Sequence, residues 1–301
     1  MKKVSQKKIE KFLRKYQVAE GEKFRLKDID PADTNIFKSV DFARERLAEG
    51  VKVMSRLQEK LYAQDKWSLL LIFQAMDAAG KDGTIKHVMS GINPQGCQVH
   101  SFKGPSSLDL NHDFLWRSNI ALPERGQIGI FNRSYYEETL VVRVHKEMLK
   151  MQRIPEKLVT KQIWKERFED INAYERYLSR NGVVIRKFFL HVSKGEQKKR
   201  FLSRLDEPAK NWKFSAADMK ERGYWDDYQE AYEDMIRHTS TDVAPWFVVP
   251  ADNKWFTHLV VAAAVIDAMR GLDLEFPEVT KAQQVALEEA RRILDPEAGA
   301  N

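Results

Sequence analysis

The residues best suited to chemistry lie in one short loop, residues 75–84, with the sequence AMDAAGKDGT. Gly80 and Gly83 would allow the backbone to approach a phosphate closely. Backbone N–H groups in such a loop converge on an anion. Lys81 adds a positive charge, and the hydroxyl of Thr84 could reach a phosphate or a magnesium ion. The loop is therefore a candidate phosphate-binding loop.

The flanking residues predict the elements that such a loop needs. Residues 69–73 form a short apolar run that is typical of a buried strand, and Ile85, Val88 and Met89 have helical spacing. A strand, a glycine-bearing loop and a helix, in this order, are the context in which a P-loop binds phosphate.

The loop departs from the common pattern G-x-x-x-x-G-K-[ST]. Ala75 stands in place of the first glycine, and Asp82 follows Lys81 where Ser or Thr is expected. Asp77 places a carboxylate inside the loop, and its charge would repel a phosphate unless a cation lay between them. This predicts a metal ligand. The alternative is a plain turn between a strand and a helix, with a solvated Asp77.

Composition predicts a folded globular protein with anionic partners. The chain has 301 residues, of which 43% are hydrophobic, and it carries a net charge of +6 with a pI near 9.1. This balance favours nucleotides, other polyphosphates, nucleic acid or a membrane surface. A single cysteine, Cys97, excludes an intrachain disulfide and fits a reducing compartment. No apolar segment follows the basic residues 1–8, and the apolar run 259–269 is too short to span a membrane, so we expect a cytoplasmic protein.

Strand-like and helix-like segments alternate along the chain. This order predicts an α/β fold with an open parallel sheet covered on both faces, and ligands at the carboxyl ends of the strands. Besides 69–73, strands are expected at 97–102, 127–131, 183–192 and 246–249. Helical spacing is found at 9–16, 36–64, 85–89, 112–121, 135–180, 195–205, 206–244, 255–269 and 278–294.

A second informative stretch reads GQIGIFNRSYYEETLVVRVH. Its apolar strand ends at Asn132, where many P-loop enzymes place a magnesium-binding Asp. Arg133 and Arg143 could hold phosphates bidentately. Glu137 could bind a metal or the acceptor. The alternative for Glu137 and Glu138 is a solvated first helical turn, favoured by the helix dipole.

Four blocks together resemble the polyphosphate kinase 2 family, and the similarity covers about residues 35–270. The blocks are A-x-D-A-A-G-K-D-G-T, SFKGPSSLDLNHDFLWR, GQIGIFNRSYYEE and FFLHVSKGEQKKRFLSRLDEPAKNWKFSAADMKER. The resemblance implies a P-loop kinase-like three-layer α/β/α sandwich with a parallel sheet and a helical lid. It also implies reversible phosphoryl transfer between inorganic polyphosphate and nucleotides with Mg²⁺, for which Mn²⁺ can substitute.

The NRSYYE form of the motif, Asn132 to Glu137, resembles the subgroup called class III, whose members phosphorylate both AMP and ADP. Members restricted to diphosphates resemble DRSWYN at this place. Asn132 therefore replaces a metal-binding Asp, and Glu137 stands where the others have Asn. The resemblance leaves Asp77 and Glu137 as the expected metal ligands.

Charge then predicts the roles of the site residues. Polyphosphate carries about one negative charge per phosphate, so transfer needs cationic neutralisation and in-line positioning. A general base is unnecessary when the acceptor is already a phosphate oxyanion. The expected catalytic residues are Asp77, Lys81, Arg133 and Glu137. The expected phosphate- or nucleotide-binding residues are Ala78, Ala79, Gly80, Asp82, Gly83, Thr84, Lys103, Asn132, Arg143, Lys194, Arg200, Arg204 and Lys213.

We expect a single P-loop kinase domain over residues 1–301. A helical extension at 1–66, a helical lid at about 134–180 with 206–244, and a helical tail at 271–301 would surround its sheet. The expected partners are inorganic polyphosphate and adenine nucleotides, with guanine nucleotides as a further candidate and neither nucleic acid nor membrane. The resemblance suggests a homodimer or homotetramer. Two alternatives stay open: an ATP-dependent nucleoside monophosphate kinase of the same fold, and a basic nucleic-acid-binding protein with a structural P-loop.

Overall fold

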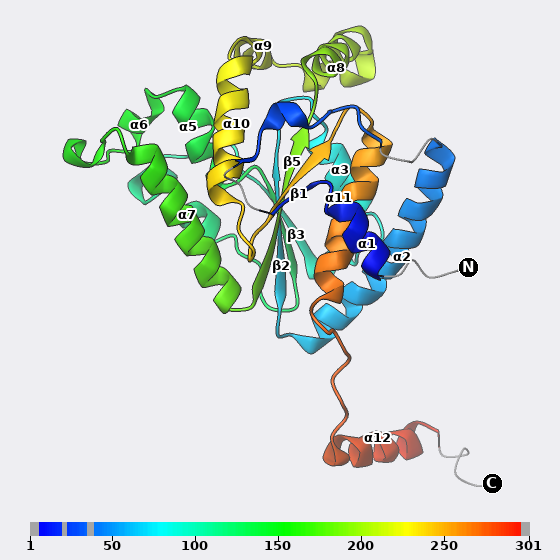
Figure 1. Ribbon diagram of the computed structural model, residues 1–301. Coiled ribbons are helices and arrows are strands. Elements are labelled where there is room, and N and C mark those ends of the chain that lie inside the picture. Colours follow the sequence, from blue (N-terminus) through cyan, green and yellow to red (C-terminus); the bar gives the residue numbers. More distant parts are fainter. Residues whose placement is uncertain (1–5, 20–22, 35–38, 296–301) are drawn as a thin grey trace.

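The computed structural model describes residues 6–19, 23–34 and 39–295, and it confirms the predicted α/β fold (Figure 1). The described residues form a six-stranded sheet in the order β1-β6-β5-β2-β4-β3. All neighbouring strands are parallel except β1, which pairs antiparallel with β6. The bounds are β1 Gln17–Val18, β2 Ser68–Gln74, β3 Cys97–Ser101, β4 Ile128–Asn132, β5 Val183–His191 and β6 Trp246–Pro250.

Strand β2 lies in the middle of this sheet, between β4 and β5. All seven of its residues are buried, as expected for a central parallel strand covered on both faces. Phe73 near its end pairs in register with Asn132 at the end of β4. The loop that follows β2 and the residues that follow β4 therefore emerge side by side at the same edge of the sheet.

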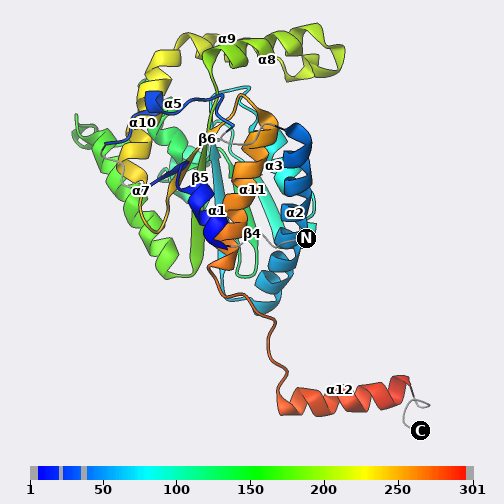
Figure 2. The same ribbon diagram turned by 45° about the vertical axis from the view of Figure 1, so that its right-hand side comes forward.

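Helices cover both faces of the sheet and form the predicted three layers (Figures 1 and 2). One layer contains α1 (Gln6–Leu13), α2 (Val40–Gln64), α3 (Lys81–Val88) and α11 (Lys254–Arg270), and α11 packs on the other three. The opposite layer contains α7 (Ile163–Arg180) and α10 (Trp225–Thr239), with the short helices α5 (Val141–Val144) and α6 (Met148–Met151) beside them.

The segments expected in a lid divide between two places. Helices α7 and α10 lie in a layer of the sandwich, and α7 packs on β5. By contrast, α8 (Lys194–Asp206) and α9 (Ala216–Gly223) lie beyond the carboxyl ends of the strands, at the top of Figure 2. Within the two predicted ranges, 134–180 and 206–244, α9 is thus the α-helix that overhangs the strand ends.

The remaining elements are short or peripheral. The helix expected at 112–121 is reduced to α4 (Trp116–Asn119), because the Asp113 carboxylate accepts the Leu115 N–H at 2.9 Å and forms a local turn instead. The amino-terminal segment is part of the body, since β1 joins the sheet and α1 packs on α11. The 3₁₀ turns are η2 Leu26–Asp28, η3 Pro94–Gly96, η4 Asp109–Asn111, η5 Tyr135–Thr139, η6 Glu156–Leu158 and η7 Pro208–Lys213.

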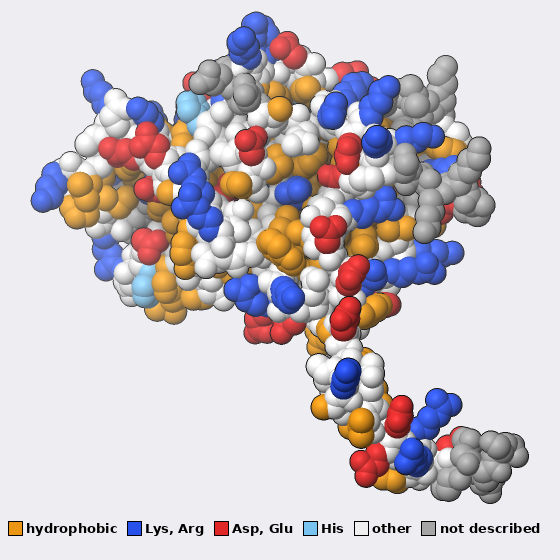
Figure 3. All heavy atoms as spheres, turned by 60° about the horizontal axis from the view of Figure 1, so that its bottom comes forward, with side chains coloured by type: hydrophobic (Ala, Val, Ile, Leu, Met, Phe, Trp, Pro, Cys, Tyr) orange, Lys and Arg blue, Asp and Glu red, His pale blue; other side chains and the backbone are white. Residues whose placement is uncertain are grey.

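Helix α12 (Lys281–Leu294) projects away from the body, on the side opposite α8 and α9 (Figure 2). None of its described side chains is buried. Figure 3 views this side of the molecule and shows charges of both signs interspersed with apolar groups. Within the described ranges, no helix combines the length and apolar content needed to cross a bilayer.

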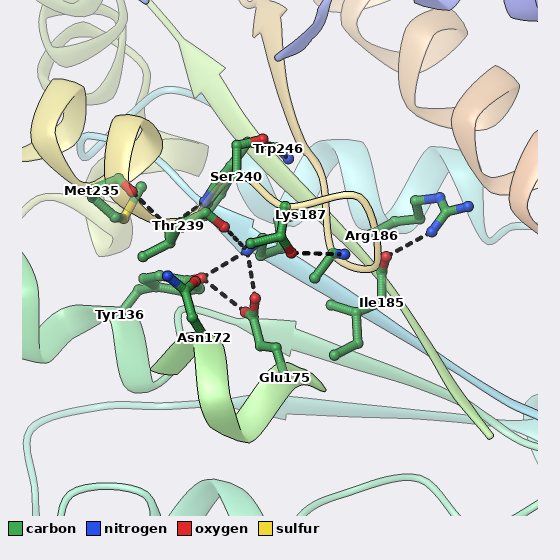
Figure 4. Close-up of polar contacts among 12 residues, drawn as sticks. Tyr136, Asn172, Glu175, Ile185, Arg186, Lys187, Met235, Thr239, Ser240 and Trp246 are labelled. Atoms are coloured by element: carbon green, nitrogen blue, oxygen red, sulfur yellow. Dashed lines mark hydrogen bonds and ion pairs between the residues drawn. The ribbon is translucent and has the colours of Figure 1, made fainter. Parts of the chain in front are cut away.

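A fully buried ion pair connects β5 to the layer formed by α7 and α10 (Figure 4). Lys187 on β5 donates to the Glu175 carboxylate at 2.6 Å, to the Tyr136 hydroxyl at 2.8 Å and to the Thr239 carbonyl at 2.6 Å. Tyr135 and Tyr136 each donate a hydroxyl to Glu175 at 2.8 Å. Both charged side chains are 0% exposed, so each is neutralised only by these partners. The network anchors the two tyrosines that follow Arg133 in the chain.

We predict that Lys187→Met lowers the free energy of unfolding by about 3–5 kcal/mol, because Glu175 would stay buried without its counter-charge. Chemical denaturation measures this value. Lys165→Met is the control, since Lys165 forms an exposed pair with Glu169 and should change stability by less than about 1 kcal/mol. Equal effects of the two substitutions would contradict the assigned role of the buried pair.

Candidate active site

The loop between β2 and α3 has the predicted P-loop arrangement of strand, loop and helix. Gly80 is the N-cap of α3 and has φ of 108°, a left-handed conformation that glycine adopts easily. Ala78 also lies in the left-handed region, with φ of 61°. A residue with a Cβ is uncommon there and persists only where its surroundings hold it. The loop backbone is therefore held in a specific shape by its neighbours.

Arg133 reaches the P-loop from the neighbouring strand. Its N–H donates to the Phe73 carbonyl at 3.0 Å, and its φ of 64° turns the chain sharply after β4. Its guanidinium then forms an ion pair with the Asp77 carboxylate, with Nη2 and Oδ1 3.0 Å apart. The structure thus brings together two residues that the sequence predicts to be catalytic.

Lys81 and Glu137 complete this group. The Lys81 ammonium donates to the Ala75 carbonyl at 2.9 Å. Burial lowers the pKa of Lys81, and the positive charge of Arg133 lowers it further against the opposing effect of Asp77 and Glu137. Burial raises the pKa of Glu137, although Arg133 and Lys81 oppose this shift.

The pKa of Arg133 is raised, whereas the pKa of Lys81 is lowered. Its burial alone would lower its pKa, but the carboxylates of Glu137 and Asp77 outweigh that effect and raise it. The two cations therefore lie close enough to repel each other and to be balanced by two carboxylates. We refer to Asp77, Lys81, Arg133 and Glu137, the four residues that the sequence predicts to be catalytic, as the cluster. A phosphate placed between Lys81 and Arg133 would relieve their repulsion.

Arg200, which the sequence predicts to bind phosphate or nucleotide, lies against the backbone of the P-loop. Its Nη1 donates to the carbonyls of Ala78 and Ala79 at 3.1 and 2.6 Å, and its Nη2 donates to the carbonyls of Ala251 and Asp252 at 2.6 and 3.1 Å. Its Nε bonds to Glu196 at 2.9 Å. These contacts engage all three nitrogens of the guanidinium with protein oxygens. In the structure, Arg200 therefore fixes the P-loop backbone to the loop after β6.

Other predicted phosphate ligands also have protein partners. Arg143 bonds to Asp234 on α10 at 2.6 Å, so it joins two helices of one layer. Arg204 bonds to Asp218 on α9 at 3.0 Å and to the Lys213 carbonyl at 3.2 Å. These contacts place both guanidinium groups in the framework around the site.

The remaining predicted cations are three lysines, Lys103 after β3, Lys194 at the start of α8 and Lys213 in η7. Lys103 follows β3 and is exposed, and its carbonyl accepts from Arg117 at 2.7 Å. The ammonium groups of Lys194 and Lys213 lie 5.8 and 5.1 Å from the ring centres of Trp225 and Trp212, respectively.

The first turn of α3 holds the other predicted binding residues. The Asn132 amide donates to the Asp82 carboxylate at 2.7 Å and so joins the end of β4 to this turn. Thr84 is buried, and Gly83 has open space where a Cβ would lie. A ligand at the site can therefore approach the α3 backbone at Gly83 more easily than it can reach the buried hydroxyl of Thr84.

Three residues at the site are not among those predicted from the sequence. Gln197 on α8 donates to the Asp77 carbonyl at 2.9 Å. Asp218 on α9 has its pKa raised by burial and then by Asp77, and Tyr232 on α10 has its pKa raised by burial and then by Glu137. Gln197 and Asp218 lie in the block from Phe188 to Arg222 that resembles the family, but no spacing rule gave them a role.

The carboxylates of the cluster fit a magnesium ion that binds together with substrate phosphates. In the part of the chain that the structure describes, no three Asp, Glu, His or Cys side chains converge into a complete metal site. Mg²⁺ commonly takes only one or two carboxylates and completes its shell with phosphates and water. Asp77 beside the phosphate loop, with Glu137 near it, matches this limited ligand set.

Comparison with known proteins decides the family. A family model described as polyphosphate kinase 2 matches residues 38–277. The chain belongs to the polyphosphate kinase 2 family. An "ADP-polyphosphate phosphotransferase" from Rhodopseudomonas palustris is 50% identical over 93% of this chain and 98% of its own length. An "AMP/ADP-polyphosphate phosphotransferase" from Meiothermus ruber is 42% identical over 92% of this chain and all of its own length.

A solved structure shows the same fold in this polyphosphate kinase 2 family. The polyphosphate kinase 2 from Arthrobacter aurescens superposes with a TM-score of 0.83 and is 38% identical. The match covers 93% of this chain and 96% of that chain. The P-loop kinase-like fold is therefore shared over nearly the whole length of both proteins.

We predict that Arg200→Lys lowers the free energy of unfolding by about 2 kcal/mol or more, because a lysine cannot bridge both pairs of carbonyls. Tripolyphosphate binding should weaken as well, since the P-loop loses its support. Denaturation and isothermal titration calorimetry measure the two effects, with Lys199→Arg on the exposed face of α8 as control. Unchanged stability with weakened tripolyphosphate binding would instead make Arg200 a direct phosphate ligand.

Proposed function

We propose that the protein transfers phosphoryl groups from inorganic polyphosphate to AMP and ADP, giving ADP and ATP, and that the reaction is reversible. The observation that supports this most strongly is the contact between Arg133 and the P-loop residue Asp77, with Lys81 beside them. The relatives named above act on polyphosphate with ADP, or with both AMP and ADP, according to their names. A site with two cations, two carboxylates and a P-loop suits two anionic reactants.

The residues of the cluster would hold the reacting groups in line. The loop amides and Lys81 bind the terminal phosphate of the chain, and Arg133 stabilises the charge on the phosphoryl group in transit. An oxygen of the nucleotide phosphate attacks the terminal phosphorus of polyphosphate. One P–O bond forms to the nucleotide, one breaks to the chain, and polyphosphate leaves shorter by one unit. No proton has to be removed from the attacking oxygen.

Asp77 and Glu137 are the residues that would hold Mg²⁺ or Mn²⁺, which would supply positive charge between the phosphates. The Asn132 amide donates a hydrogen bond to the Asp82 carboxylate, so Asn132 orients the first turn of α3. Within the cluster, Arg133 would leave Asp77 and turn to phosphate when the ligands bind. The carboxylate that it leaves would then need the metal as its counter-charge.

Three further properties stay predictions from the sequence. They are assembly into a homodimer or homotetramer, a cytoplasmic location and the use of guanine nucleotides. Sedimentation analysis and assays with GMP and GDP can measure the first and third directly.

The direct test incubates the purified protein with AMP, Mg²⁺ and polyphosphate, without any nucleoside triphosphate. Chromatography should show ADP first and then ATP. Lys81→Ala and Asp77→Ala should each lower the rate by at least about 10³-fold, because each removes a charge that acts on the transferred group. Circular dichroism should show that both variants stay folded. Near-normal turnover in either variant would reject its assigned role, and no product with the wild type would reject the function.

A further prediction concerns the choice between AMP and ADP as the acceptor. Glu137→Asn should lower kcat/KM for AMP by about tenfold more than for ADP, a difference of ~1.4 kcal/mol. The reason is that the resemblance associates Glu at this position with use of AMP, and Glu137 lies beside the cations of the cluster. Glu147→Asn, at an exposed glutamate, is the matched control. An equal loss for both acceptors would refute this role.

A further inference from the structure

One face of α8 contacts the carbonyl groups of three consecutive P-loop residues. Gln197 donates its side-chain N–H to the Asp77 carbonyl at 2.9 Å. Arg200, one helical turn further on, donates to the carbonyls of Ala78 and Ala79. Gln197 is 1% exposed and Arg200 is 9% exposed, so water does not compete for these bonds. Three successive carbonyl oxygens of the loop are therefore held by donors on α8.

This arrangement suits a loop that binds phosphate. A carbonyl oxygen carries a partial negative charge, so it would repel an anion that the backbone N–H groups of the loop attract. The bond from Gln197 gives the Asp77 carbonyl a partner in the protein and keeps this oxygen turned toward α8. The side chain of Asp77 pairs with Arg133. Gln197 thus fixes the backbone of a residue whose carboxylate belongs to the cluster.

The other end of the Gln197 amide contacts α9. Its Oε1 accepts from Nη1 of Arg222, which lies in the last turn of that helix. Both polar ends of the amide are therefore engaged, and each partner accepts only one of the two chemistries: a carbonyl needs a donor, and a guanidinium needs an acceptor. One buried side chain links the P-loop to the helix that overhangs the strand ends (Figure 2).

A second contact joins the same two helices. Arg204 of α8 bonds to Asp218 of α9 at 3.0 Å. Burial raises the pKa of Asp218, Asp77 raises it further, and Arg204 and Arg133 lower it, so this carboxylate lies near the cluster. The bonds of Gln197 extend this pair of helices to the P-loop backbone.

We propose that Gln197 is a positioning residue for phosphoryl transfer. Its N–H holds Asp77 in the orientation that meets Arg133, and its oxygen holds α9, through Arg222, above the same loop. The proposal rests on the proposed function for the reaction that is positioned. A displacement of reacting groups by about 1 Å can lower a rate about 100-fold, so loss of this link should slow transfer more than it weakens phosphate binding.

A glutamate at this position separates positioning from simple packing. In Gln197→Glu, the ionised carboxylate can accept from Arg222 but cannot donate to the Asp77 carbonyl. The protonated carboxyl can do both, because its O–H replaces the amide N–H. Arg222 favours the ionised form and burial favours the protonated form. Lowering the pH should therefore restore the missing donor in this variant, whereas Gln197→Leu has no polar atom to restore.

The first experiment measures kcat with polyphosphate and ADP for wild type and both Gln197 variants at several pH values. At the alkaline end, each variant should be at least about tenfold slower than wild type. As the pH falls, the ratio of Gln197→Glu to wild type should rise several-fold, and the ratio of Gln197→Leu to wild type should stay constant. Gln284→Glu, on the exposed helix α12, is the matched control and should equal wild type throughout.

Tripolyphosphate binding gives a readout that does not depend on the reaction. Isothermal titration calorimetry at the same pH values should show weaker binding by Gln197→Glu, with a smaller loss than in kcat, and recovery at low pH. Circular dichroism should show the same folded state at each pH. Recovery of both ratios with the fold unchanged would support the assignment.

The link to α9 is tested by a double-mutant cycle with Gln197→Leu and Arg222→Leu. If the two residues act as one link, the double variant should be no slower than the slower single variant. Additive losses in kcat would contradict the link.

Other outcomes separate this proposal from the proposed function. A constant ratio of Gln197→Glu to wild type across the pH range, or near-normal kcat in Gln197→Leu, would overturn the role of Gln197 while phosphoryl transfer persists. A recovery that follows refolding would also overturn it, because Gln197 would then only support the fold. Wild type that binds tripolyphosphate but phosphorylates neither AMP nor ADP would overturn the function instead, and the binding ratios would still decide whether Gln197 positions the loop.

Discussion

The ion pair between Asp77 and Arg133 is the contact on which the arrangement of the site depends. It joins the loop after β2 to the residue after β4, and only the parallel pairing of these strands brings the two together. Without ligand, each charge neutralises the other. A phosphate that takes Arg133 leaves Asp77 uncompensated, so anion binding and cation binding become linked at one carboxylate. Because Arg133 balances the charge of the Asp77 carboxylate, a phosphate-binding loop can contain this residue.

The protein holds this contact in place with interactions on two sides. Arg200 fixes the carbonyls of Ala78 and Ala79 from α8, and Ala78 keeps a left-handed conformation that is unfavourable for alanine. Beneath Arg133, the buried network of Lys187 and Glu175 anchors Tyr135 and Tyr136. The site is thus positioned before any substrate binds, which lowers the cost of ordering it during the reaction.

The sequence could predict the elements more readily than the partners of individual side chains. Apolar runs identified the five parallel strands, and the glycine-bearing loop identified the P-loop. A basic helix, however, has the same sequence pattern whether its arginine contacts phosphate or backbone carbonyls, so the pattern cannot predict the bonds from Arg200 to the P-loop carbonyls. Likewise, helical spacing could not predict that α7 and α10 lie in a layer of the sandwich. Such facts depend on contacts between distant segments.

A crystal structure of the protein with tripolyphosphate and Mg²⁺ tests the central claim most directly. The account predicts an anion at the start of α3, in contact with Lys81 and Arg133, with the metal on Asp77. The bond from Lys81 to the Ala75 carbonyl would be broken, and Arg200 would stay on its four carbonyls. A chain bound only along the outer face of α8, with Asp77 and Arg133 still paired, would contradict the account.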